Sequence, residues 1–270
     1  MSGEDALAGA LRRERFIALA ALLLIAVLAW LWLMREATRM SGMDTAAMAD
    51  VRMNHMLMMS PTFTAWSAPL ATYLFVMWFM MMIGMMTPSA APVVLLYLGV
   101  ARHAARSGHR FASGAWFLAG YLAAWAGFSL LATMAQWAME SAAMMTPAMR
   151  AASQPLGAAV LIAAGAYQWL PLKDACLAQC RAPLSFIQQH GGFSSSAMGA
   201  LRLGLRHGLY CVGCCWALML ALFAVGIMNL LWIAALMCLV LAEKLLPWGR
   251  WVSRAAGLGA IGTGLAMLQT

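Results

Sequence analysis

Charged residues are scarce in this sequence. Only 10% of its 270 residues are Asp, Glu, Lys or Arg, whereas 64% are hydrophobic. Soluble domains carry charge on about a quarter of their residues, so this composition excludes an ordinary soluble domain. Acidic residues are the scarcest, 9 against 17 basic ones, which leaves a net charge of +8. We interpret the basic excess as an orientation signal and as contact with lipid headgroups of the bilayer, with no nucleic-acid partner.

The sequence also lacks the alternation of apolar and polar residues that is typical of strands in a membrane barrel. Several apolar runs instead approach or exceed about eighteen residues, long enough to cross a hydrocarbon core about 30 Å thick. A helix satisfies its own backbone hydrogen bonds in lipid, where no water can do so. The sequence therefore predicts an all-α, polytopic transmembrane helical bundle, with residues 1–270 forming a single transmembrane domain.

About seven spans are expected. They cover residues 16–34, 69–100, 112–139, 155–172, 201–225, 230–243 and 252–268. The second is too long for one straight crossing, and Pro88 removes a backbone donor within it, so we predict a helix kinked or broken there. In the third, glycines at 114, 120 and 127 are candidate points of close helix approach. Serines at 194 to 196 could cap a helix that begins before Arg202.

The distribution of basic residues predicts an orientation. Lys and Arg near the span ends concentrate in the N-terminus and in residues 101–111, 173–206 and 243–254. With seven spans these four segments fall on one side, which the positive-inside rule makes cytoplasmic. We therefore expect a cytoplasmic N-terminus, a Met-containing outer loop at 35–68 and a cytoplasmic Cys-containing loop at 173–206.

Three cysteines and a histidine share one stripe of the predicted fifth span. In a helix, His207, Cys211 and Cys215 lie at i, i+4 and i+8, with Cys214 beside them at i+7. Thiolates together with an imidazole suit Cu(I), Zn(II) or iron better than Mg or Ca. Cysteine is also a good small residue for buried packing, so packing without a ligand is the alternative interpretation.

Two further groups of sulfur atoms are candidates for the same chemistry. Cys176 and Cys180 are one helical turn apart and lie on the predicted cytoplasmic side, where thiols persist and metal ligation is favoured over disulfides. The second span carries methionines on two neighbouring ridges of the predicted helix, with Met81 and Met85 on one and Met82 and Met86 on the other. Methionine is a common gap-filler in helix packing, but thioethers are also ligands for Cu(I). Thioethers outside and thiols inside predict a route or store for a soft metal, with Cu(I) the best fit and zinc or iron as alternatives.

Taken together, several segments resemble the DUF2182 family, described as predicted metal-binding integral membrane proteins of bacteria. The matching segments are residues 77–92, 173–183, 208–219 and 226–230, and the pair Glu243-Lys244. They cover residues 69–244, and the segment that joins the cysteines to Trp216 is the most specific. The resemblance implies a metal-binding protein of the bacterial inner membrane, and it names neither a substrate nor a reaction.

Three functions are compatible with these residues. The first is a soft-metal protein that binds, stores, delivers or transports Cu(I), working with other membrane subunits or a metallochaperone. The second is the membrane subunit of a metal-dependent oxidase, or a thiol–disulfide redox protein, which needs an exposed reactive thiol and a resolving partner. The third is a scaffold subunit of a membrane complex, in which the thiols only pack. Whether the protein is an enzyme stays open at this point.

Overall fold

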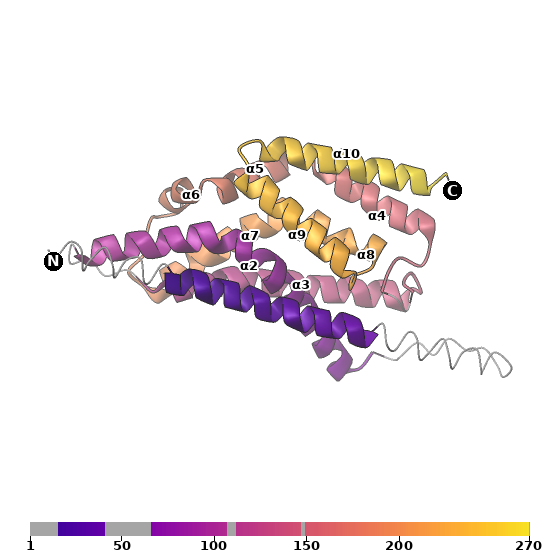
Figure 1. Ribbon diagram of the computed structural model, residues 1–270, viewed down its shortest axis with the longest axis horizontal. Helices are drawn as coiled ribbons and strands as arrows, with labels where there is room; N and C mark the ends of the chain where they lie inside the picture. Colours follow the sequence, from indigo (N-terminus) through magenta and orange to yellow (C-terminus); the bar gives the residue numbers. More distant parts are fainter. Residues whose placement is uncertain (1–15, 41–65, 107–111, 147–148, 270) are drawn as a thin grey trace.

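The computed structural model describes residues 16–40, 66–106, 112–146 and 149–269. Within these ranges every regular element is a helix, which confirms the predicted all-α class (Figure 1). Most of the segment predicted as a Met-containing outer loop, residues 41–65, lies outside the described residues.

The chain begins its described part with an N-terminal helix and continues through nine further helices. In order they are Phe16–Met40, α2 (Ala68–Arg106), α3 (Gly114–Ser141), α4 (Gln154–Tyr167), α5 (Pro171–Arg181), α6 (Pro183–Gln189), α7 (Ala197–Leu220), α8 (Leu222–Val225), α9 (Leu230–Leu245) and α10 (Gly249–Met267). The segment 173–206, predicted as a Cys-containing loop, is therefore largely helical: it holds most of α5, all of α6 and the start of α7. Ser196 caps α7 as expected, because its hydroxyl accepts a hydrogen bond from the Gly199 amide at 3.0 Å.

Four of the described helices are long and apolar enough to cross a membrane. They are the N-terminal helix, α2 as far as Val100, α3, and α7 continued by α8. The pair α4 and α5, bent by 62°, would make a fifth if it forms one broken span. These helices are compatible with membrane insertion, but the expected seven spans are not confirmed. The predicted sixth span is the 16-residue α9, and the predicted seventh is α10, whose first turns carry Arg250 and Arg254.

The second predicted span is one continuous helix. α2 stays helical through Pro88 and Pro92, so the chain is not broken there, although the ribbon changes direction partway along (Figure 1). Close to Pro88, the Met86 carbonyl accepts hydrogen bonds from the Ser89 hydroxyl at 2.9 Å and the Tyr121 hydroxyl at 3.2 Å. These two donors tie this turn of α2 to its own Ser89 side chain and to α3, whereas the carbonyl that Pro88 leaves without an amide donor is that of Gly84, four residues earlier.

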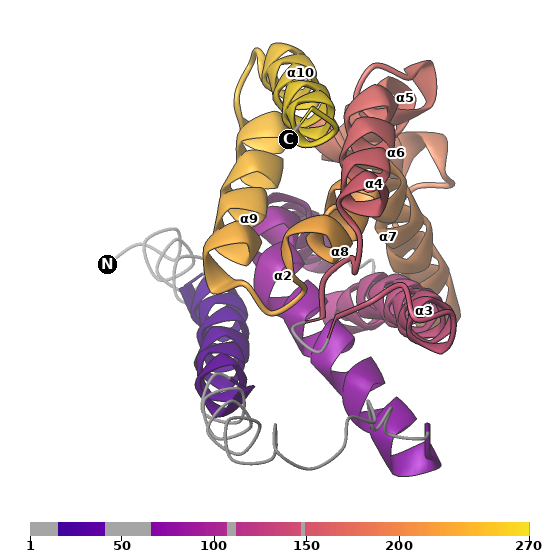
Figure 2. The ribbon, with the colours of Figure 1, turned by 90° about the vertical axis from the view of Figure 1, so that its right-hand side faces the viewer.

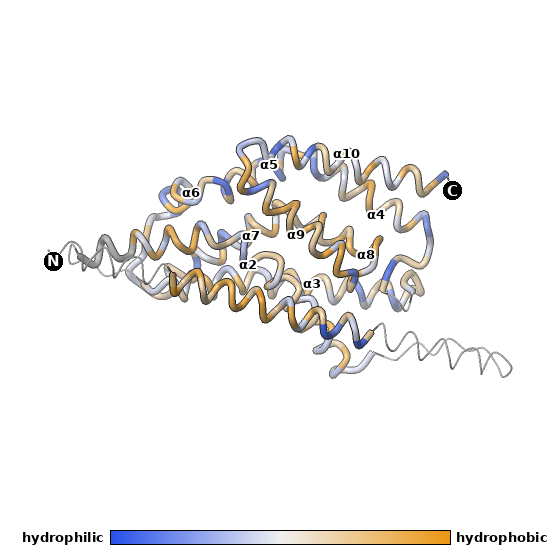
Figure 3. Tube along the Cα trace, viewed as in Figure 1, coloured by the Kyte–Doolittle hydropathy of each residue, from blue (hydrophilic) through white to orange (hydrophobic). Residues whose placement is uncertain are grey.

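The helices pack in two neighbouring pairs, α3 with α7 and α4 with α10 (Figure 2). Glycines allow the α3–α7 pair to approach closely: a Cβ on Gly204 would lie 1.9 Å from the Phe117 carbonyl oxygen, and one on Gly120 would lie 2.0 Å from that of Leu201. Gly120 is thus a point of close approach, as predicted, whereas a Cβ on Gly127 would meet nothing within 4 Å. Hydrophilic residues gather near α5 and the start of α10, where Arg250 and Arg254 of α10 lie beside Asp174 of α5 (Figure 3).

Candidate metal centre

The structure joins the two predicted cysteine groups into one cluster. α7 carries Cys211, Cys214 and Cys215 into the core, where all three are almost fully buried. α5 packs across this part of α7, and the Cys180 thiol interacts with those of Cys211 and Cys214. The Cys176 sulfur lies against α7 as well, 2.8 Å from the position that a Cβ on Gly213 would take. Five thiols from two helices therefore meet in one region.

Cys211 is the most strongly contacted of these thiols. Its sulfur lies 3.1 Å from the Tyr121 hydroxyl of α3 and accepts a hydrogen bond from the Lys244 ammonium of α9 at 2.9 Å. The same ammonium donates to the Ser89 hydroxyl of α2 at 3.0 Å. Groups from α3, α5 and α9 thus surround this sulfur of α7, and α2 is joined to it through the Lys244 ammonium. An ammonium at this distance offsets the charge of a thiolate, which is the form of cysteine that binds metal.

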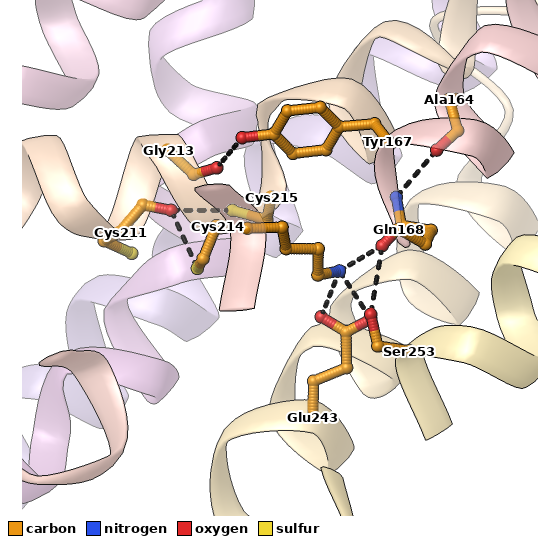
Figure 4. A network of polar contacts seen from close by, with 10 residues as sticks. Ala164, Tyr167, Gln168, Cys211, Gly213, Cys214, Cys215, Glu243 and Ser253 are labelled. Carbon is orange, nitrogen blue, oxygen red and sulfur yellow. Dashed lines mark hydrogen bonds and ion pairs between the residues drawn. The ribbon is translucent and has the colours of Figure 1, made fainter. Parts of the chain in front are cut away.

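The other two α7 cysteines are held by the backbone of the same helix. The thiols of Cys214 and Cys215 both donate to the Cys211 carbonyl oxygen, at 3.1 Å each (Figure 4). Across from them, the Tyr167 hydroxyl donates to the Gly213 carbonyl oxygen, which ties α4 to the same turn of α7. These contacts fix the turn that presents the sulfurs, since each engages a backbone carbonyl within it.

His207 lies one turn before Cys211 and points into a group of aromatic rings. Its ring centroid is 5.0 Å from that of Phe186, 5.9 Å from Phe117 and 6.0 Å from Tyr121. The side chain is buried, and its Nδ1 atom has no hydrogen-bond partner among the described residues. The predicted stripe is therefore buried along its length, with the imidazole in an aromatic setting and the thiols in a polar one.

The converging thiols do not form a closed coordination shell. Across the described ranges, no group of three or more His, Cys, Asp or Glu side chains is arranged to hold a metal ion. All six cysteines are free, and Cys238, on α9, is exposed and separate from the cluster. The arrangement brings soft ligands within reach of one another, and rotamer changes would have to complete a site.

The model of a protein family named PpoB2, described as a copper chaperone, matches residues 75–267. The chain belongs to this family. No curated protein and no solved structure matches it. The matched residues include the whole of α5, α7 and α9, hence every thiol of the cluster and Lys244. The match supports the copper-related character predicted from the sequence, and it does not bear on the DUF2182 name.

Within the PpoB2 match, the α2 methionines are core residues. Their side chains are fully buried and belong to the same hydrophobic cluster as the α7 cysteines; they are Met81, Met82, Met85 and Met86. One link to the thiols runs through Tyr121, whose hydroxyl contacts both the Met86 carbonyl and the Cys211 sulfur. The observed contacts are those of packing, and metal binding by the thioethers stays a prediction.

The charged residues that pack beside the cysteine cluster had no role assigned to them from the sequence. Lys173 and Glu243 form a fully buried ion pair at 2.9 Å. The Lys173 ammonium also donates to the Gln168 side-chain oxygen, which accepts a hydrogen bond from Ser253 at 3.3 Å (Figure 4). A signal was present: Lys173 and Lys244 are the only lysines in the sequence, and Lys173 lies three residues before Cys176. Ionisable groups inside apolar bundles are functional candidates by default.

Proposed function

We propose that this protein is an integral membrane copper-handling protein that binds Cu(I) through Cys211 and Cys214 and passes the ion to a partner protein. The observation that carries the proposal is the meeting of Cys180, a partly buried residue of α5, with these two buried thiols of α7. Clustered thiols are favoured ligands for Cu(I). The family description, copper chaperone, supports copper as the ion.

Delivery requires a site that can open, and α5 supports such a step. It is an 11-residue helix that begins at Pro171 and is followed at once by Pro183 at the start of α6. Cys180 is only partly buried, so the cluster reaches the protein surface on the α5 side. A movement of this short helix would expose the α7 thiols to an incoming or departing ion without unfolding the long helices.

The proposed orientation keeps the thiol cluster at the cytoplasmic face. Basic residues surround the α5 end of the structure: Arg181 donates to the Leu246 carbonyl at 2.6 Å, and Arg250 and Arg254 lie 3.5 and 3.8 Å from Asp174. The positive-inside rule then favours the cytoplasm for this end, where reduced thiols persist. In this arrangement the buried α2 methionines would form a second site or a path through the membrane.

The proposal is tested by titrating the purified protein, in detergent or nanodiscs, with Cu(I) against a chromophoric chelator. We expect one tightly held Cu(I) in the wild type, lost when Cys211→Ser and Cys214→Ser are combined. Cys238→Ser is the matched control, because that thiol is exposed and lies outside the cluster. Failure of the folded wild type to take up Cu(I), or full binding by the double variant, would contradict the proposal.

A further inference from the structure

Lys244 brings a second positive charge into the protein interior, besides that of Lys173, which is paired with Glu243. Lys244 is 9% exposed, and among the described residues its ammonium contacts the Cys211 sulfur at 2.9 Å and the Ser89 hydroxyl at 3.0 Å. The neighbouring carboxylate does not neutralise it, because both Glu243 oxygens accept hydrogen bonds from Lys173 at 2.9 Å. The charge of Lys244 is therefore directed at the thiol cluster.

We propose that Lys244 is a built-in counter-charge that makes the thiol cluster selective for a monovalent soft ion over a divalent one. The inference rests on the proposed function, in which Cys211 and Cys214 are the ligands. Both sulfurs bind the ion as thiolates, and any proton that either of them still carries leaves to solvent as the ion enters. Cys180 and Cys215 keep their protons.

The charge balance then differs between ions. Cu(I) with two thiolates has a net charge of −1, which the ammonium of Lys244 brings to zero. A divalent ion on the same two thiolates is already neutral, so Lys244 would leave one uncompensated positive charge. A buried charge without a partner is strongly disfavoured in a protein interior. Cu(I) also accepts the low coordination number that two thiolates provide, whereas Zn(II) requires four ligands in structural sites.

A purely structural role for Lys244 makes a different prediction. Its hydrogen bonds to α2 and α7 could simply hold the end of α9 in place. In that case removing the charge would weaken binding of every ion to the same degree and would lower the thermal stability of the metal-free protein. A counter-charge, in contrast, changes the ratio of the Cu(I) affinity to the Zn(II) affinity.

The test measures dissociation constants for Cu(I) and Zn(II) in the wild type, Lys244→Met, Lys244→Gln and Lys244→Arg, each by chelator competition. Lys244→Met should weaken Cu(I) binding by at least about tenfold while Zn(II) binding holds or tightens. Lys244→Gln keeps a donor for Ser89 without the charge, and it should shift the ratio in the same direction even if Lys244→Met folds poorly. Lys244→Arg should restore the preference for Cu(I).

Equal weakening for both ions, or an unchanged ratio in both uncharged variants, would overturn the counter-charge. Such a result would leave the proposed Cu(I) site intact, because the wild type would still bind copper. If the folded wild type takes up no Cu(I), the proposed function and the inference fall together, and the double cysteine variant then shows no further loss.

Discussion

Replacing Gly204 by alanine should push α3 away from α7 and disturb the contacts of Cys211. The new Cβ would lie 1.9 Å from the Phe117 carbonyl oxygen and 2.7 Å from its carbonyl carbon. Ordinary contacts of a Cβ begin at 3.4 Å, so the helices must separate by about 1.5 Å to accept one methyl group. Phe117 lies one turn before Tyr121, whose hydroxyl contacts the Cys211 sulfur.

Two opposing effects set the size of the change. Alanine is a better helix former than glycine by about 1 kcal/mol, which favours the variant. Overpacking in a close-packed core is unfavourable by about 1–3 kcal/mol, and here the opposing atoms belong to the backbone and cannot rotate away. The overpacking cost therefore falls at the upper end of its range, and we expect a net loss of unfolding free energy of about 2 kcal/mol, together with weaker Cu(I) binding.

The assay is equilibrium unfolding in mixed micelles followed by far-UV circular dichroism, paired with the Cu(I) titration. Gly127→Ala is the matched control on α3, because a Cβ there would meet nothing within 4 Å, and it should be neutral or slightly stabilising. If Gly204→Ala matched this control in both stability and Cu(I) affinity, close α3–α7 packing would not be what positions Tyr121.

Two further changes test the polar groups around the cluster. Lys173→Met leaves Glu243 buried without its partner, so we expect a loss of about 3–5 kcal/mol in unfolding free energy. Adding Glu243→Met should recover much of this loss. If Lys173→Met alone were as stable as the wild type, the ion pair would not matter for stability. Tyr121→Phe removes the hydroxyl that contacts Cys211 and the Met86 carbonyl, so stability should fall by about 1 kcal/mol. Cu(I) affinity should fall severalfold in the same variant, and an unchanged affinity would show that the hydroxyl does not act on the sulfur.

The helices were predictable from the sequence because lipid and a protein interior both require the chain to satisfy its backbone hydrogen bonds internally, which an apolar helix does. Long apolar runs gave the N-terminal helix, α2, α3 and α7, and Ser196 indicated where α7 begins. The number of spans was harder to predict, since a membrane crossing needs about 20 residues and α9 has 16. Pro88 did not break α2, which stays helical through both of its prolines.

The candidate site was predictable only where one helix supplies it. Helical periodicity places the α7 cysteines on one stripe, and the structure buries that stripe. Helical periodicity does not say which helices pack together. The contact of Cys180 with α7 and the approach of Lys244 to Cys211 therefore became visible only in the tertiary structure. The pairing of Lys173 with Glu243 was hidden for the same reason.

The end of α9 links the thiol cluster to the buried ion pair. Consecutive residues of a helix point about 100° apart, and here Glu243 contacts Lys173 while Lys244 contacts Cys211. Lys173 belongs to α5, the helix that also carries Cys180. α5 is thus held against α9 by the ion pair and against α7 by sulfur contacts. Any movement of α5 that opens the cluster must strain or break the Lys173–Glu243 pair, so release of an ion in the proposed function is coupled to separating two buried charges.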